Sequence, residues 1–410
     1  MRRAALWLVA FVACTGALGA ILVATRTDLV DVPAALERLL DPRTDGERAI
    51  AYAQGRLASA PNDPRFMAAL ASAYLVRIRE TYDPALYTKA SELLDRAGVL
   101  APVDPDVAIA SGSLALSRHD FIAALDWGLV ARSAAPARPA GYGVLVDAYV
   151  ELGRYEDAVA AAQQMVDLRP DLASYSRVSY IRELHGDLDG AIDAMRRAVE
   201  AGAPRSEGTA WCEVQLGNLF LAKDDLASAE RAYENALQRV DGYVFALAGQ
   251  AKVLAARGDV AGAAALDQQA AQRLPVPDFL IALADLHERL GDMTRAGQDA
   301  DVVSAMEQLL KANGVRTDVD LALFDADHDV RLPEALSAAR AEYAIRPSVT
   351  VAMTLAWTEY KNGDLADASA HASAALRLGW RDPVAVRRAA TIAAAAGDVA
   401  LARRAAELSR

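Results

Sequence analysis

Apolar residues recur with helical spacing along most of the chain, and residues 142–170 show the pattern most clearly. Leu145 and Tyr149 fall on one face of a helix with 3.6 residues per turn. Gly153 then ends this helix, because glycine adopts the left-handed conformation at a helix end at little cost. A second apolar stripe with the same period begins at Ala158. The pattern predicts two antiparallel helices, and the small side chain of Ala158 lets them approach closely.

This pattern returns at steps of 33, 34, 38 or 39 residues along the chain. The turn before the small residue also recurs, as GRYEDA, GDLDGA, GDVAGA, GDMTRA, GDLADA and GDVALA. The alanines equivalent to Ala158 are Ala90, Ala124, Ala191, Ala229, Ala263, Ala296, Ala335, Ala368 and Ala402. A fixed period of this length is typical of a solenoid, in which each unit buries its apolar face against the next. We therefore expect an all-α fold of about ten helical hairpins.

A helical hairpin that repeats every 34 residues resembles the tetratricopeptide repeat. Leu216, Gly217 and Phe220 fit the L-G-x-x-Y motif of that family with a conservative aromatic exchange. Several repeats end in proline as in the family, at Pro102, Pro136, Pro170, Pro275 and Pro347. The resemblance covers about residues 63 to 410 and implies a right-handed superhelix with a concave groove lined by the first helix of each pair.

The amino-terminal residues 4–25 carry no charge and follow Arg2 and Arg3. Such a run is long enough to cross a membrane as a helix, with the basic residues keeping the amino end in the cytoplasm. The same run also fits a cleaved signal peptide, although it lacks a clean A-x-A site. A lipoprotein signal at Cys14 is the third alternative, with a poor match to the usual motif. All three interpretations export the rest of the chain.

Three segments are expected: a signal anchor or signal peptide over residues 1–26, a tether and capping helices over 27–62, and the solenoid over 63–410. The phrases RIRETYDPALY, DLASYSRVSYIRELHGD, LALFDADHD and LAWTEYKNGD resemble a group of exported bacterial proteins with these repeats. That resemblance implies a scaffold at the cell envelope, on the outer side of the cytoplasmic membrane. If the signal is cleaved, the chain is periplasmic or secreted.

Composition narrows the classes of function. The net charge of −12 argues against general nucleic-acid binding, which needs a basic surface. The sequence contains no G-x-S-x-G, phosphate loop, dinucleotide fingerprint or H-E-x-x-H motif. We therefore expect no catalytic residues, no cofactor and no metal. The expected partner is a protein or peptide, with a membrane contacted through the amino-terminal helix.

By the resemblance, the binding groove is lined at fixed distances before each small alanine. These positions are Asp147, Tyr180, Glu183, Trp211, Asn218, Phe245, Lys252, Trp357 and Tyr360. Aromatic residues with a polar tip suit an interface, because they bury a large area with few rotatable bonds. Tyr180, Trp211 and Phe245 fall on consecutive repeats, and one interpretation places them in a single patch. The competing interpretation is that these aromatic rings fill gaps between helices.

Asp325, Asp327, His328 and Asp329 form the densest polar cluster. Oxygen and imidazole donors so close together are compatible with a divalent cation. A receptor for a metal or small ligand at residues 325–329 is therefore the alternative function. Helix capping and turn formation explain the aspartates more simply.

Overall fold

The computed structural model describes residues 44–409, and the chain divides into two compact units, Met1–Arg48 and Ala49–Arg410. The predicted membrane or signal helix and most of the tether fall outside the described residues. Within residues 44–409, no helix combines the length and the hydropathy that are needed to span a membrane. The second unit carries all the repeats and is described below.

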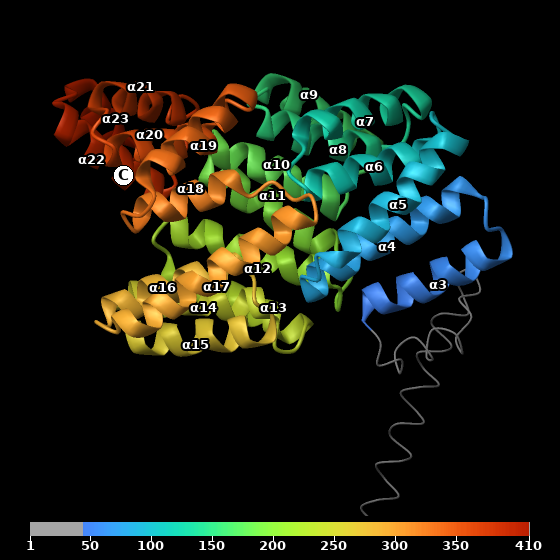
Figure 1. Ribbon diagram of the computed structural model, residues 1–410, viewed down its shortest axis with the longest axis horizontal. Coiled ribbons are helices and arrows are strands. Elements are labelled where there is room, and N and C mark those ends of the chain that lie inside the picture. Colours follow the sequence, from blue (N-terminus) through green and yellow to red (C-terminus); the bar gives the residue numbers. More distant parts are fainter. Residues whose placement is uncertain (1–43, 410) are drawn as a thin grey trace, which may run out of the picture. The chain divides into compact units, whose positions relative to one another are not determined.

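The described chain is all-helical, and ten antiparallel helical hairpins follow α3 (Asp45–Ser59) (Figure 1). The hairpins are α4–α5 (Pro64–Thr81, Ala85–Leu100), α6–α7 (Pro105–Ser117, Phe121–Ala134), α8–α9 (Pro139–Glu151, Tyr155–Leu168), α10–α11 (Leu172–Leu184, Leu188–Ala201), α12–α13 (Glu207–Ala222, Leu226–Arg239), α14–α15 (Val244–Ala256, Val260–Arg273), α16–α17 (Pro277–Arg289, Met293–Ala312), α18–α19 (Asp318–Asp327, Leu332–Ile345), α20–α21 (Val349–Lys361, Leu365–Ala375) and α22–α23 (Pro383–Ala396, Val399–Leu408). The two helices of each hairpin pack on each other, and consecutive hairpins pack together as the repeat period predicts, except that α16–α17 and α18–α19 are not packed in this way.

The recurring glycine–aspartate turn explains how each hairpin reverses. Gly186 ends α10 with a φ of +75°, which a residue without Cβ adopts cheaply. The side chain of Asp187 then accepts a hydrogen bond from the Gly190 amide at 2.9 Å and caps α11. Asp259 caps α15 in the same way through the Gly262 amide.

The small alanines form the centre of the helix packing. Nine of the ten are at most 4% exposed, including Ala158, which is fully buried. Ala402 is the exception and is exposed. It lies on α23, on which no further hairpin packs within the described residues.

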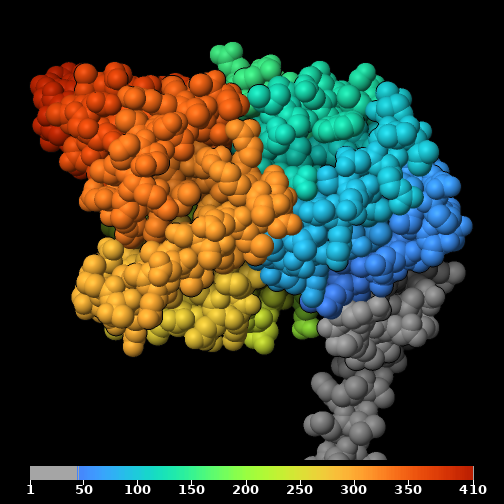
Figure 2. All heavy atoms as spheres, in the orientation of Figure 1, coloured from blue at the N-terminus to red at the C-terminus, as the bar shows by residue number. Residues whose placement is uncertain are grey.

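The solenoid also folds back, so that its carboxyl-terminal hairpins contact its amino-terminal ones. α17 is the longest helix, with 20 residues, and the segment after it reaches the turn between α6 and α7. There the Arg316 amide donates to the Arg118 carbonyl oxygen at 3.0 Å. Thr88 of α5 donates a hydrogen bond to Asn313 at 3.3 Å. Figure 2 shows the later hairpins lying directly against the earlier ones on the surface.

Two hairpin turns meet the returning segment closely enough to require glycine. A Cβ on Gly153 would lie 2.7 Å from the Pro347 carbonyl oxygen. A Cβ on Gly186 would clash with the carbonyl oxygen of Gly379. Nearby, the Val349 amide donates to the hydroxyl of Tyr155 at 2.8 Å. These glycines therefore serve the long-range contact as well as the local turn.

Candidate binding cavity

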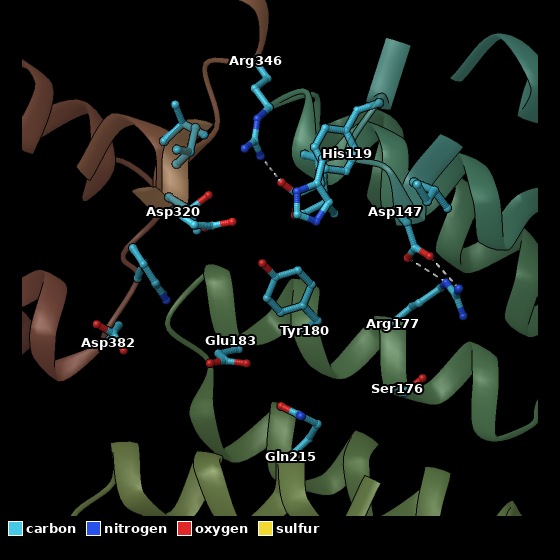
Figure 3. Close-up of a pocket in the computed structure, with 18 of the residues that line it drawn as sticks. His119, Asp147, Ser176, Arg177, Tyr180, Glu183, Gln215, Asp320, Arg346 and Asp382 are labelled. Carbon is cyan, nitrogen blue, oxygen red and sulfur yellow. Dashed lines mark hydrogen bonds and ion pairs between the residues drawn. The ribbon is translucent and has the colours of Figure 1, made fainter. Parts of the chain in front are cut away.

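A cavity of about 880 Å³ lies between two walls of the solenoid (Figure 3). The first, here called the repeat wall, comprises the lining residues of α8, α10 and α12. They are Asp147, Val150, Glu151, Leu172, Ala173, Ser176, Arg177, Tyr180, Glu183, Glu207, Gly208, Trp211 and Gln215. The second, the return wall, comprises the lining residues of α18, α20, α22 and the loops before α20 and α22. They are Val319, Asp320, Leu323, Arg346, Thr350, Val351, Met353, Thr354, Trp380, Asp382, Ala385 and Arg388.

The repeat wall is built by the first helices of three consecutive hairpins, as the repeat register predicts for a groove. Tyr180 projects from α10 into the middle of the cavity (Figure 3). Trp211 of α12 lies along the same wall. Arg177 on α10 reaches back to α8 and forms a bidentate ion pair with Asp147 at 2.6 and 2.8 Å. This pair fixes the two helices relative to each other where the cavity begins.

Arg346 joins the two walls. Its guanidinium group pairs with Glu151 of α8 at 2.8 Å and with Glu342 of α19. It also lies over the ring of Phe121, 4.8 Å from the centroid. The Arg346 side chain is largely buried, so its charge is balanced by these two carboxylates rather than by solvent. Burial raises the pKa of Glu151, and the neighbouring Arg346 opposes that rise.

Two carboxylates and one tyrosine of the cavity have no hydrogen bond or ion pair to any described residue. They are Tyr180, Glu183 and Asp320. Tyr180 is 38% exposed although it lies deep between the walls, so its exposed surface faces the cavity interior. Burial raises the pKa of Glu183 to about 7, and the charge of Asp382 adds to the effect. Burial also raises the pKa of Asp320, which the nearby His119 partly offsets.

The structure brings four of the predicted groove residues together in this cavity: Asp147, Tyr180, Glu183 and Trp211. Phe245 does not join Tyr180 and Trp211 in a single patch. Its ring packs between Tyr243 and Phe279, with centroids 5.4 Å away in both cases. Phe245 therefore fills a gap between helices, which is the competing interpretation of the aromatic positions.

Asn218 also lies away from the cavity lining. Its side-chain oxygen accepts a hydrogen bond from the hydroxyl of Tyr233 at 3.0 Å. Tyr233 is fully buried between Gly217 and Gly249, where the absence of Cβ atoms leaves room for its ring. Asn218 thus completes the hydrogen bonding of a buried tyrosine. Lys252 is exposed and is likewise not part of the lining.

Trp357 and Tyr360 stack on each other near the carboxyl-terminal hairpins, with centroids 5.0 Å apart. The Trp357 indole donates a hydrogen bond to Asp327 at 2.8 Å, and Arg388 lies over its ring. Arg388 in turn reaches the cavity, but the two aromatic rings do not line it. These residues tie α18, α20 and α22 together.

The aspartates of the alternative cation site do not converge. Each is ion-paired to a different basic residue: Asp325 to Arg331, Asp327 to Arg388 and Asp329 to Lys361, all at 2.6 Å. The grouping at residues 325–329 is therefore not brought together by the fold, because the side chains of a turn point in different directions.

His328 instead meets two carboxylates of α16. Its Nδ1 lies 3.1 Å from Glu288 Oε1, and its Nε2 lies 3.5 Å from Asp285 Oδ1. The potential ligand atoms of the three residues lie within 4.8 Å of one another. The two acidic residues are about 40 positions earlier in the chain, so local spacing gave no sign of this cluster.

Sequence reasoning missed the whole return wall, including Asp320, Arg346 and Asp382. One usable signal was the 39-residue step between Ala296 and Ala335, which the long α17 produces. Another was the 38-residue step between Ala191 and Ala229, since Glu207 and Gly208, at the start of α12, line the cavity. Departures from the period thus marked two places near the cavity, but not which side chains face it.

Residues 144–206 and 214–276, which correspond to α8–α11 and α12–α15, match the family model described as tetratricopeptide repeat. Among solved structures, TTC0263, a thermophilic TPR protein from Thermus thermophilus, is similar over 42% of this chain and 93% of its own, with 23% identity and a TM-score of 0.39. The MamA protein is similar over 41% of this chain and 91% of its own, with 19% identity and a TM-score of 0.32.

PilW, described as a widely conserved type IV pilus biogenesis factor, is similar over 49% of this chain and 92% of its own, with 14% identity and a TM-score of 0.41. No curated protein matches the chain in sequence. The matched stretches lie in the most regular part of the solenoid. The protein contains tetratricopeptide repeats, and its remaining hairpins share their antiparallel helical architecture.

Proposed function

We propose that the protein is a non-enzymatic scaffold that holds a segment of a protein partner in the cavity between the repeat wall and the return wall. Tetratricopeptide repeats typically mediate protein–protein interactions, and two exposed aromatic side chains of this chain, Tyr180 and Trp211, line the cavity. The observation that carries the proposal is the cavity itself, whose volume of about 880 Å³ suits a few side chains of an extended segment.

The lining has the composition of a binding surface. Tyr180 and Trp211 are large hydrophobic residues, each more than a third exposed, and both face the cavity. Aromatic side chains in a concave site commonly provide most of the binding energy of an interface. Polar groups around them, including Gln215 and Glu183, can pair with the backbone or side chains of a bound segment.

The polar groups of the cavity support binding rather than catalysis. His119 holds the returning chain, because its Nδ1 lies 2.8 Å from the Arg316 carbonyl oxygen. The Ser176 hydroxyl donates to the Ala173 carbonyl oxygen of its own helix at 3.2 Å. A nucleophile needs a base within hydrogen-bonding distance, and these two side chains are each engaged with the backbone instead.

We further propose that the solenoid acts outside the bacterial cytoplasmic membrane. The support is the uncharged run of residues 4–25 behind Arg2 and Arg3, which favours export in each of its three interpretations. Protease added to spheroplasts of the source bacterium should degrade the solenoid without lysis. Full protection from the protease until lysis would contradict this location.

The binding proposal is tested by placing a photo-cross-linking amino acid at Trp211 in the full-length protein in its native cells. The expected result is one discrete adduct whose cross-linked peptide derives from a single region of a partner. The matched control places the same amino acid at Val159, which is exposed on α9 and outside the lining. Equal adducts at both positions, or none at residue 211, would contradict the proposal.

One observation favours cation binding as a second candidate function. His328, Asp285 and Glu288 bring together an imidazole and two carboxylates, a donor set that suits a divalent transition metal. Zn²⁺ or Ni²⁺ added to the metal-stripped protein should raise its melting temperature, and His328→Ala should abolish the increase. An equal increase in His328→Ala would exclude this site.

A further inference from the structure

The cavity holds more negative than positive charge. Its lining has six carboxylates and four arginines, Arg79, Arg177, Arg346 and Arg388, so the carboxylates outnumber the arginines by two. One of the arginines, Arg388, is already paired at 2.6 Å with Asp327, which lies outside the lining. The side chains that face the cavity are therefore short of cations.

The lack of a positively charged partner affects two of the six carboxylates most. Asp147 is paired with Arg177 and Glu151 with Arg346, so these carboxylates are neutralised within the chain. Glu207 accepts a hydrogen bond from Tyr243 at 2.7 Å, and Asp382 caps the first turn of α22. Arg79 of α4 forms no ion pair with a described residue, and its charge acts on Tyr243, beside Glu207. The other two acidic residues, Glu183 on the repeat wall and Asp320 on the return wall, have carboxylates without any partner among the described residues.

Tyr180 lies at the same place and adds two features that suit a cation. Figure 3 shows its ring in the middle of the cavity, with the hydroxyl directed toward the return wall. The hydroxyl has no hydrogen-bond partner among the described residues, so its oxygen is free to accept one. The faces of Tyr180 and Trp211 can also attract a positive charge through their π electrons.

From this arrangement we infer that the cavity takes a cationic side chain, an arginine or a lysine of the bound partner segment, between Glu183, Asp320 and Tyr180. The inference rests on the function proposed above and specifies the chemistry of the partner. An anionic group is disfavoured by the excess of carboxylates, and a neutral group would leave both carboxylates desolvated and unpaired.

The pKa values of Glu183 and Asp320 are consistent with this inference. Burial raises the pKa of Glu183 to about 7, and the charge of Asp382 adds to the rise. Desolvation between the walls also raises the pKa of Asp320, although its side chain is exposed to the cavity, and the charges of His119 and Arg346 oppose that rise. Neither carboxylate has a counter-charge in direct contact with it among the described residues. A guanidinium or ammonium group between them would supply that charge and lower both pKa values. Binding of the cation should therefore strengthen as the pH rises through about 7, when Glu183 becomes ionised.

The test uses the full-length protein and two matched pairs of capped pentapeptides in alanine context. In the first pair the central residue is arginine or citrulline, and in the second it is lysine or norleucine. Titration calorimetry at pH 8 should show the charged member of each pair binding at least tenfold more tightly than the neutral member. For the arginine peptide, affinity should also fall at least tenfold between pH 8 and pH 5.5.

Two variants test which residues produce the preference for the charged peptide. Glu183→Gln and Asp320→Asn should each remove most of the preference for the charged peptide, and Glu183→Gln should also flatten its pH dependence. Asp193→Asn is the matched control, because this aspartate is exposed on α11 and outside the lining. It should bind like the natural protein. Circular dichroism melting shows whether each variant is folded, and having two separate variants keeps the test informative if one of them unfolds.

Equal binding of charged and neutral peptides, or no binding of either, would overturn the inference while leaving the proposed function in place. Spermidine binding without peptide binding would overturn the assignment to a side chain. Failure of the proposed function is recognised separately, by the absence of a polypeptide adduct at Trp211.

Discussion

The two walls of the cavity differ in how the chain builds them. The repeat wall comes from three consecutive hairpins whose first helices are related by the repeat period, and its packing is local. The return wall comes from hairpins far along the chain, which are held in place by a few long-range contacts. Arg346 with Glu151 and Val349 with Tyr155 are the clearest of these contacts. The cavity exists only because these contacts form.

The difference shows where a solenoid can acquire a specific site. A strictly periodic array offers an open groove in which each repeat contributes similar positions. A slip in the period, such as that produced by the 20-residue α17, redirects the following hairpins. Here the redirected hairpins close part of the groove and add Asp320 opposite Glu183. The predictions below perturb one wall at a time.

The largest effect is expected for Arg346→Met. This change leaves Glu151 and Glu342 without their shared cation, and removing one member of a buried ion pair typically costs about 3–5 kcal/mol. The midpoint of urea unfolding, followed by circular dichroism, should fall accordingly. Arg154→Gln is the control, because its pair with Asp157 is exposed and worth about 0.5 kcal/mol or less.

The effect of Arg346→Met on different helices shows which wall depends on this ion pair. If Arg346 joins them, its loss should also expose the α6–α10 turns to hydrogen exchange, while α12–α15 stay protected. A change no larger than that of Arg154→Gln would mean that the return wall does not depend on this ion pair. Additional loss on adding Glu151→Gln would show that the two residues act independently.

The repeat wall could be predicted from the sequence because the resemblance to the tetratricopeptide repeat places the groove at fixed distances before each small alanine. Tyr180, Glu183 and Trp211 were identified in this way, and each lines the cavity. The same rule also selected Phe245 and Asn218, which do not line the cavity, since it gives the side of the helix but not the neighbouring side chains. Whether an aromatic ring faces open space or a second ring, as Phe245 faces Phe279, depends on packing.

The return wall could not be predicted, because nothing in a repeat register encodes contacts between distant hairpins. Gly153 and Gly186 look like ordinary helix ends in the sequence, and both have positive φ as expected. Their second role, which is to let Pro347 and Gly379 approach, becomes visible only in three dimensions. The contacts of His328 could not be predicted for the same reason, because its partners lie on α16 rather than in its own turn.

The next effect is expected for Gly186→Ala, which tests the approach of the return segment. The left-handed backbone alone costs alanine about 1 kcal/mol, and the clash with the Gly379 carbonyl oxygen should add about 1–3 kcal/mol. Gly363→Ala is the matched control, because Gly363 has a φ of +87° and nothing within 4 Å of the added Cβ. Urea unfolding of both variants measures the difference. Equal losses of stability in the two variants would show that the close contact between Gly186 and Gly379 does not contribute to the free energy of unfolding.

A smaller, pH-dependent effect is expected for Glu183→Gln. The pKa of Glu183 in the fold, about 7, is above its ordinary value of 4.5, so the folded protein binds this proton more tightly than the unfolded chain. The natural protein should therefore lose stability as the pH rises from about 4.5 to 7, and the variant should not.

Above pH 7 the variant should be the more stable of the two by about 1–2 kcal/mol, a figure reduced for the partial exposure of Glu183 to the cavity. Below pH 4.5 the two should be alike. Melting temperatures across this range provide the measurement, and Asp320→Asn should act in the same direction. A natural protein that becomes more stable than the variant with rising pH would show that Glu183 already has a counter-charge.

The smallest effect on stability is expected for Trp211→Ala. The Trp211 side chain is 39% exposed toward the cavity, so its removal should change the free energy of unfolding by only about 1 kcal/mol. Binding of the arginine peptide should nevertheless weaken about tenfold or more, because the ring forms part of the binding surface. Phe245→Ala should do the reverse: its ring packs between Tyr243 and Phe279, so stability falls while affinity is kept. Calorimetric titration and thermal melting of the same preparations would then distinguish Trp211, which contacts the ligand, from Phe245, which only packs. If both variants changed affinity and stability to a similar degree, the two residues would not have these different roles.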